Sequence, residues 1–145
     1  MHALIALLAL FTIRGPLAAQ AREVIQLPGA SMGLPFSSAV RVGNMLYLSG
    51  QIGNLPGTRR LADTGVAGQT RQALENIKAV LAHAASSLDR VVKCTVFLVD
   101  IRDYAAMNAV YATYFPERPP ARSTVAGSGL ALDARVEIEC LATVG

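Results

Sequence analysis

Short runs in which apolar and polar residues alternate, the pattern of half-buried β-strands, recur along this chain of 145 residues. Two of these runs, 38–42 and 45–49, flank Gly43-Asn44, a pair that favours a tight two-residue turn, so they predict a β-hairpin. A shorter extended segment is expected before them, at 23–27. Gly50 follows the second strand, and its missing Cβ would allow another part of the molecule to approach the backbone closely.

Three more strands are predicted in the second half of the chain. The run 91–99 is largely apolar on both faces, which predicts a central strand covered on both sides. In the next run, near 121–125, Arg122 and Thr124 share one face. The last run, 135–143, alternates regularly, and its core-facing residues are expected to be Val136, Ile138, Cys140 and Ala142.

Two segments repeat with the period of an α-helix. The first begins near Val66, and its buried stripe is expected to contain Thr70, Ala73, Leu74, Ile77, Val80, Leu81 and Ala84. The second is expected to begin after Asp100, a favourable N-cap residue, and to stop at Pro116. Its stripe is formed by Ile101, Tyr104, Asn108, Tyr111 and Phe115.

The resulting order β-β-α-β-α-β-β predicts an α+β sandwich in which two helices cover one face of a mixed sheet. The other face carries more apolar residues than two helices need to cover. A second copy packing on that face is therefore expected. The residues that lead to this expectation are Leu46, Leu48, Val91, Phe97 and Leu141.

Composition is that of one globular domain. Hydrophobic residues make up 52% of the chain, and the net charge is +3. The densest basic cluster is the pair Arg59-Arg60, so neither net charge nor clustering favours nucleic acid as a partner.

The first 21 residues resemble a secretory signal peptide. An apolar run at 3–13 is followed by Ala19-Gln20-Ala21, a small-x-small cleavage site, although the start lacks Lys and Arg. The run is too short to cross a bilayer. We expect a cleaved leader at 1–21, a single domain at 22–145, a periplasmic or secreted location, and no membrane attachment after cleavage. The alternative is a mis-assigned start codon upstream of a cytoplasmic protein.

Cys94 and Cys140 both lie in alternating apolar runs. The favoured interpretation is two separate buried thiols that act as small hydrophobic residues. A disulfide would require that the two strands bring the Cα atoms within about 7 Å.

Motifs for phosphate loops, dinucleotide binding, serine nucleophiles and zinc proteases are absent. With two histidines in the chain, a histidine-based triad or a histidine-rich metal site is not expected. The remaining chemical groups are Arg122 and the pair Glu137 and Glu139. Arg122 is either a surface residue paired with one of these glutamates or a clamp for a substrate carboxylate. If their strands run side by side, Arg122 and a glutamate that activates water would share one pocket, but strand alternation does not choose between Glu137 and Glu139. Asn108, an amide on an apolar stripe, either bonds local backbone or faces a pocket.

Three segments together resemble the Rid (YjgF) family of reactive-intermediate deaminases. They are Gly43-Asn44 followed by Ser49-Gly50-Gln51, the helical segment 72–81, and Pro120-Ala121-Arg122-Ser123 followed by Val136-Glu137-Ile138-Glu139. The resemblance covers nearly everything after residue 30. It implies a chorismate-mutase-like α+β fold and a homotrimer with pockets between subunits. It also implies hydrolysis of 2-aminoacrylate-like enamines and imines to 2-keto acids and ammonia, with neither a metal nor an organic cofactor.

The resemblance also assigns roles to residues. Arg122 would clamp the substrate carboxylate, and Glu137, chosen by the family motif over Glu139, would position the attacking water. Gly50 and Thr124 would line the pocket through their backbone, with Ser49 and Asn108 nearby. Phe36 stands where the family often carries a tyrosine and would keep only the stacking surface, and Thr124 stands where many members carry cysteine.

An exported member of the family would not meet a cytosolic substrate such as 2-aminoacrylate. The alternative expectation is therefore a non-catalytic trimer of the same family that binds a small imine or 2-keto acid or acts as a chaperone. A ribonuclease role, also attached to this family, finds no support in the histidine and basic-residue content.

Overall fold

The computed structural model describes residues 21–29, 33–62 and 64–145. The leader expected at 1–21 lies, except for Ala21, outside the described residues. In chain order the elements are β1 (Arg22–Ile25), β2 (Ala39–Val42), β3 (Met45–Leu48), β4 (Gln51–Ile52), α1 (Val66–His83), β5 (Val91–Leu98), α2 (Tyr104–Tyr114), β6 (Ala121–Ala126) and β7 (Val136–Thr143), with three short 3₁₀ turns at Leu88–Arg90, Ile101–Asp103 and Ala131–Asp133. None of the helices in these residues is long and apolar enough to cross a membrane.

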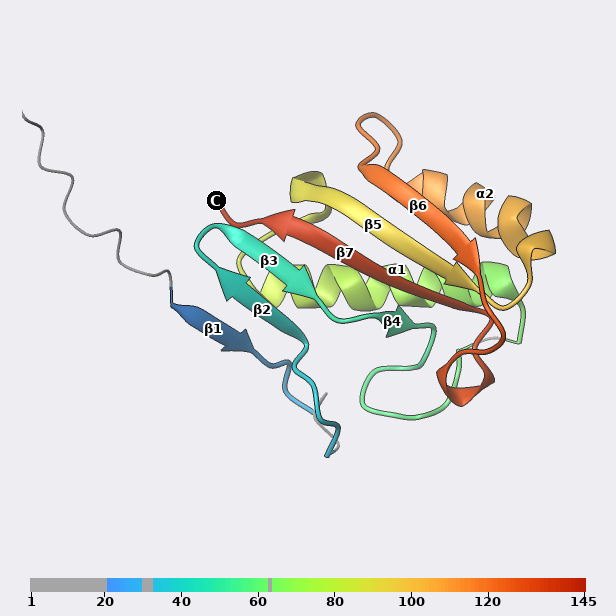
Figure 1. Ribbon diagram of the computed structural model, residues 1–145, viewed down its shortest axis with the longest axis horizontal. Coiled ribbons are helices and arrows are strands. Elements are labelled where there is room, and N and C mark those ends of the chain that lie inside the picture. The colour runs from blue at the N-terminus through green and yellow to red at the C-terminus, as the bar shows by residue number, and fades with distance from the viewer. Residues whose placement is uncertain (1–20, 30–32, 63) are drawn as a thin grey trace, which may run out of the picture.

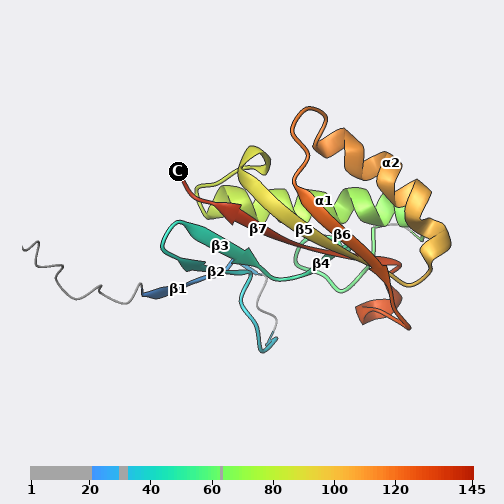
Figure 2. The same cartoon turned by 45° about the horizontal axis from the view of Figure 1, so that its top comes forward.

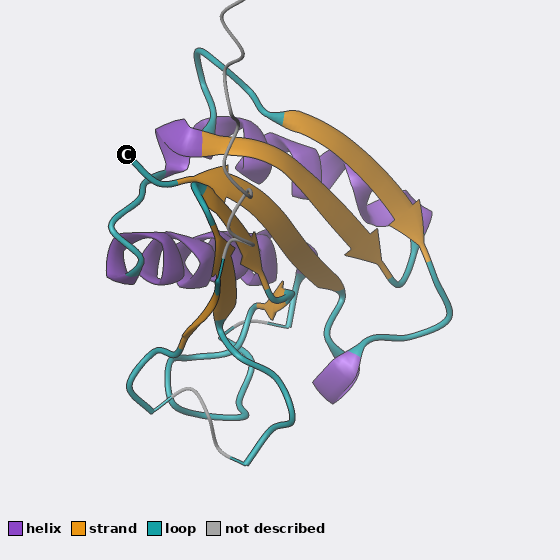
Figure 3. Ribbon diagram, turned by 60° about the vertical axis from the view of Figure 1, so that its left-hand side comes forward, coloured by secondary structure: helices purple, strands orange, loops and turns teal. Residues whose placement is uncertain are grey.

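The sheet has the strand order β1-β2-β3-β7-β5-β6, and the short strand β4 also pairs with β7. Among the strand pairs of the described residues only β5 and β6 run parallel, and α2 is the crossover between them. Both helices lie on one face of the sheet, and the other face is open in the single chain (Figures 1, 2 and 3). The predicted α+β sandwich with two helices on one face of a mixed sheet is therefore confirmed. The homotrimer remains a prediction.

The core lies between the sheet and α1, as the helical stripe predicted. Every residue expected on the buried stripe of α1, from Thr70 to Ala84, is buried. The facing residues of β7, Val136 to Ala142 at every second position, are buried as well. Gly43-Asn44 forms the predicted hairpin turn between β2 and β3, with Gly43 at a positive φ of 59°.

The expectation of excess apolar residues on the open face was wrong for three residues. Leu46, Leu48 and Val91 are all buried in the core on the helix side of the sheet. For Val91 the reason is a bulge: Val91 is opposite Ala142 but Lys93 is opposite Leu141, so Val92 is an extra residue that shifts the alternation. Strand β5 is consequently covered on one face, while its other face carries exposed or half-buried residues.

The expectation of two separate thiols was also wrong. Strands β5 and β7 are direct neighbours, and Cys94 is opposite Cys140 in their register. Their Cα atoms are 4.1 Å apart, and the two residues form a disulfide on the helix-facing side of the sheet. The sequence alone did not show that these two strands, 46 residues apart, pair with each other.

Reducing this disulfide should destabilise the fold. The cross-link closes a loop of 46 residues and so restricts the conformations of the unfolded chain. In the loop-entropy model a loop of this length raises the free energy of unfolding by about 4 kcal/mol. Urea unfolding with and without a reductant measures the difference. The double variant Cys94→Ala, Cys140→Ala is the control, because its unfolding should not respond to the reductant. Equal stability of the oxidised and reduced protein would contradict the prediction.

Candidate active site

Arg122 lies beneath the second helix. In the parallel pairing of β5 and β6 it is opposite Cys94, so its side chain leaves the sheet on the helix side, towards α2. Its Nη2 donates a hydrogen bond of 3.0 Å to the hydroxyl of Tyr104. The guanidinium carbon lies 4.6 Å from the ring centroid of Tyr111 and 5.6 Å from that of Tyr104, distances at which an arginine is attracted to an aromatic ring. Two tyrosines of α2 therefore hold the guanidinium in place.

No carboxylate neutralises Arg122 within the described part of the chain. The two aspartates beside α2 are engaged elsewhere. Asp103 accepts a hydrogen bond of 2.9 Å from Nε of Arg135, and Nη2 of the same arginine forms an ion pair with it at 2.7 Å. Asp100 is held by Arg102, whose hydrogen bonds lower its pKa to about 2. The positive charge of Arg122, on a half-buried side chain, is consequently available to an anion from outside the chain.

A hollow of about 370 Å³ opens beside Arg122, between α2 and the start of β6. It is lined by Asn108, Tyr111, Ala112, Phe115, Pro119, Pro120 and Arg122. The amide of Asn108 makes no hydrogen bond to any described residue. The hydroxyl of Tyr111 is buried and likewise has no partner among them, and burial raises its pKa to about 12, so it stays protonated at neutral pH. Thr124 is half-buried on the same side of β6.

The second half of the site is built around Gly50. Between Tyr47 and Gln51 the chain has three residues, whereas between their partners Leu141 and Ile138 on β7 it has two, so a bulge separates β3 from β4. The carboxylate of Glu137 lies against this bulge. A Cβ at Gly50 would collide with Oε1 of Glu137, and for this reason only glycine fits the present geometry.

Ser49 ties a third segment to the same place. Its hydroxyl donates a hydrogen bond of 2.6 Å to the carbonyl oxygen of Ser37, and its backbone N–H donates to the carbonyl of Ser38. Phe36, the residue before Ser37, is 55% exposed. The predicted residues Ser49, Gly50 and Glu137 therefore lie together, and Phe36 is the chain neighbour of the Ser37 that Ser49 binds.

Glu137 is chemically distinct from Glu139, although both face the open side of the sheet. Partial burial raises the pKa of Glu137 above its ordinary value of 4.5, and the negative charge of Glu139 raises it further. Glu139 is exposed. A half-buried carboxylate with a raised pKa is a better proton acceptor at neutral pH than an exposed one.

The structure does not bring Arg122 and Glu137 into one pocket of a single chain. Strands β6 and β7 lie on opposite sides of β5 rather than side by side. Glu137 is opposite Phe97, on the face away from the helices, whereas Arg122 is opposite Cys94, on the helix face. The expected shared pocket was therefore wrong for one chain, and so was the alternative that Arg122 pairs with a glutamate of the last strand. Arg122, Asn108 and Thr124 form one half, and Glu137, Gly50, Ser49 and Phe36 form the other.

Two aromatic residues of the site were missed. Tyr104 and Tyr111 were assigned to the apolar stripe of the second helix, together with Asn108. This stripe is in fact the wall that faces Arg122. The presence of Asn108 on it was the available signal, because an amide among apolar residues marks a surface that faces something other than a dry core.

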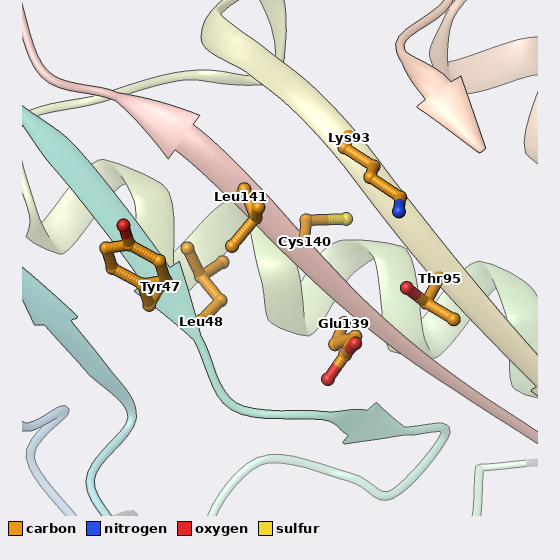
Figure 4. Close-up of a pocket in the computed structure, with 7 residues that line it drawn as sticks. All are labelled: Tyr47, Leu48, Lys93, Thr95, Glu139, Cys140 and Leu141. Carbon is orange, nitrogen blue, oxygen red and sulfur yellow. The ribbon is translucent and has the colours of Figure 1, made fainter. Parts of the chain in front are cut away.

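The open face carries a further hollow of about 310 Å³ in the middle of the sheet. Figure 4 shows that Tyr47 comes from β3, Lys93 and Thr95 from β5, and Glu139 from β7. With Tyr47 at 47% exposure, this is a broad, partly polar face without a covering layer in the single chain.

A family model described as Endoribonuclease L-PSP matches residues 29–144. The chain belongs to this family, also called the Rid family. A RutC family protein of Pyrococcus horikoshii is 48% identical over 83% of this chain and 97% of its own. The 2-iminobutanoate/2-iminopropanoate deaminase of Mus musculus is 38% identical over 86% of this chain and 93% of its own. The crystal structure of a Rid-family protein from Yersinia pestis is 42% identical, has a TM-score of 0.80, and covers 86% of this chain and 100% of its own.

The Rid family therefore includes deaminases of imines, and the residues of this chain can be compared with that chemistry. Across 21–29, 33–62 and 64–145, no group of three or more His, Cys, Asp and Glu residues is arranged to hold a metal ion. What the two halves offer is an unneutralised arginine and a carboxylate with a raised pKa.

Replacing Gly50 by alanine should damage catalysis more than folding. The added Cβ displaces the end of a flexible glutamate side chain, which costs the fold little, but it moves the carboxylate by about 1 Å or more. A misplacement of this size lowers turnover by about a hundredfold. Steady-state kinetics and thermal unfolding of Gly50→Ala measure both effects. Gly129→Ala is the control, because Gly129 lies in an exposed loop, has no positive φ and has no atom near its Cβ position. Normal turnover in Gly50→Ala would show that the carboxylate position is unimportant.

The pH dependence of activity should report the titration of Glu137. Its raised pKa means that kcat/KM should fall with decreasing pH at a midpoint above 4.5. In Glu139→Gln this midpoint should move to lower pH, because a neighbouring negative charge is removed. A raised folded-state pKa also means that the ionised side chain lowers the free energy of unfolding above that pKa. Glu137→Gln should therefore not reduce thermal stability at neutral pH. If Glu139→Gln leaves the acid midpoint of kcat/KM unchanged, the assignment of this midpoint to Glu137 is contradicted.

Proposed function

We propose that this protein hydrolyses small 2-imino acids, and the enamines that tautomerise to them, to 2-keto acids and ammonia. The observation that carries the proposal is the pair of half-sites on opposite faces of the sheet, one with Arg122 and one with Glu137. The relative from Mus musculus named as a 2-iminobutanoate/2-iminopropanoate deaminase supports the substrate class.

Arg122 would bind the carboxylate of the substrate. A guanidinium presents parallel N–H donors that match both oxygens of a carboxylate, and this one lacks a carboxylate partner among the described residues. The hollow beside it, about 370 Å³ in volume, accommodates a substrate of a few carbon atoms. The unpaired amide of Asn108 lies in the same hollow and offers further hydrogen bonds.

Glu137 would act on the water molecule. As a carboxylate it accepts a proton from water while the water oxygen adds to the carbon of the C=N bond. That proton then passes to the nitrogen, which gives a carbinolamine with one OH and one NH₂ group on the same carbon. The hydroxyl proton of the carbinolamine moves through Glu137 to the nitrogen as the C–N bond breaks, so that ammonia leaves and the C=O bond of the 2-keto acid forms. This sequence uses one water molecule and no electron acceptor. The raised pKa of Glu137 suits a group that first takes up and then returns a proton.

The two halves require a second copy of the chain. Because Arg122 and Glu137 lie on opposite faces, the Arg122 half of one copy can meet the Glu137 half of the next only across a subunit interface. We propose a homotrimer with one such site at each interface. The open face with Tyr47 and Leu141 supports this assembly, since partners in a closed ring bury matching surfaces.

Loss of an imine generated in situ by an amino-acid oxidase tests the activity. The wild-type protein should accelerate hydrolysis over buffer. Arg122→Ala should lower kcat/KM by about a thousandfold, because two charge-assisted hydrogen bonds to the carboxylate are lost. Glu137→Gln should lower kcat by about a hundredfold, the usual contribution of a general base. No acceleration by the wild type, together with tight binding of a 2-keto acid, would support the alternative of a non-catalytic ligand-binding trimer.

Mixing the two inactive variants tests the shared site. Refolding Arg122→Ala with Glu137→Gln gives interfaces in which an intact Arg122 half meets an intact Glu137 half. In an equal random mixture about one quarter of the interfaces combine these halves, so about one quarter of the wild-type activity should return. Each variant refolded alone is the control. If both residues acted within one chain, the mixture would remain inactive.

We also propose that the protein works in an oxidising compartment. The disulfide between Cys94 and Cys140 supports this location, since such bonds persist outside the reducing cytosol. RNA cleavage, which the description of the matching family model names, has no support at the site: His83, the histidine in the described part of the chain, is exposed on α1.

A further inference from the structure

Tyr104 is the one residue that forms a hydrogen bond with the guanidinium of Arg122 within the described part of the chain. Its oxygen accepts from Nη2, so its own hydroxyl hydrogen points elsewhere. No described residue accepts that hydrogen. The side chain is 41% exposed, which leaves the hydroxyl open to a molecule that approaches Arg122.

The other tyrosine of the pair differs in each of these respects. Tyr111 presents its ring to the guanidinium carbon, at 4.6 Å, and its hydroxyl is buried. It supports Arg122 as an aromatic surface. Tyr104 and Tyr111 lie seven residues apart, two turns of α2 on one face, and Arg122 reaches along that face. The hydroxyl of Tyr104 therefore lies next to the N–H groups of the guanidinium, whereas Tyr111 contacts the guanidinium with its ring.

We infer that Tyr104 is a substrate-binding residue, whose hydroxyl donates to the same carboxylate that Arg122 clamps. A hydroxyl that accepts from a cation becomes a stronger donor, because hydrogen bonds in a chain polarise one another. A carboxylate has about four acceptor positions on its two oxygens, so it accepts from the guanidinium and from the hydroxyl at once. Tyr104 thereby favours ligands with a carboxylate over ligands with a neutral amide at this position.

The inference rests on the proposed function, because it concerns the carboxylate that Arg122 binds. It adds a determinant of specificity that the Arg–Glu pair alone does not supply. A carboxamide still accepts from Arg122 through its carbonyl oxygen, but it has one acceptor oxygen, and its NH₂ group repels a second donor. Discrimination between the two ligands should therefore decrease when the hydroxyl is removed.

Calorimetric binding of 2-oxobutanoate and of its amide, 2-oxobutanamide, tests the inference on the full-length protein. In Tyr104→Phe the Kd for 2-oxobutanoate should rise about tenfold, the loss of one hydrogen bond to a charged group. The Kd for the amide should change less than about twofold. In turnover of 2-iminobutanoate, KM should rise by about the same factor as Kd, while kcat changes little.

Tyr114→Phe is the matched control. It removes the same oxygen from the same helix, but this hydroxyl donates to Glu75 on α1, at 2.8 Å, away from Arg122. Neither ligand should bind differently to it. Circular dichroism and thermal unfolding check that both variants fold.

The outcomes separate the inference from the proposed function. If the wild type binds 2-oxobutanoate and Tyr104→Phe binds it equally well, the role of Tyr104 is overturned and the deaminase proposal stands. If Tyr104→Phe weakens acid and amide equally, Tyr104 only positions Arg122, and the direct contact is overturned. If the wild type neither binds 2-oxobutanoate nor hydrolyses 2-iminobutanoate, both proposals fail together. In that case Arg122→Ala will also behave like the wild type, whereas a failure of the Tyr104 inference alone leaves Arg122→Ala defective.

Discussion

The alternation of side chains across the central strands β7 and β5 determines the layout of the whole molecule. Successive residues of a strand point to opposite faces, and one face of this sheet is buried against α1. Cys140 and Ile138 must face the core, so Glu137 must face away from it. On the other side of β5 the same constraint places Arg122 with Cys94, towards α2. The two candidate site residues of one chain, Arg122 and Glu137, are thus separated by the packing that stabilises the chain.

Much of the fold follows from local sequence, because local interactions determine it. Gly43-Asn44 can hardly form anything but a tight turn between apolar strands, and the α1 stripe has one possible buried side. The pairing of β5 with β7 does not follow in this way, since it joins segments distant along the chain. The disulfide of Cys94 with Cys140 and the bulge at Val92 both depend on that pairing, and both escaped prediction.

The site shows the same division. Arg122 and the pair Glu137 and Glu139 were candidates from the residues alone, and the family resemblance chose Glu137, whereas the residues that contact Arg122 were missed. Tyr104 and Tyr111 have the helical spacing of a buried stripe, and only the strand opposite them reveals that they hold a cation. Asp103, at the start of α2, is paired with Arg135 through a hydrogen bond from Nε and an ion pair with Nη2.

The disulfide connects these features. Arg122, Cys94 and Cys140 form one row across β6, β5 and β7, on the helix-facing side of the sheet. A covalent bond within the row fixes β5 against β7, and β6 is held through its parallel pairing with β5. Since β6 is an edge strand, its position depends on β5 and on α2. The cross-link therefore rigidifies β5, the strand that pairs with the β6 strand carrying Arg122, and it does so from the helix-facing side of the sheet. In this chain the row that contains the disulfide stabilises the sheet and also contains Arg122.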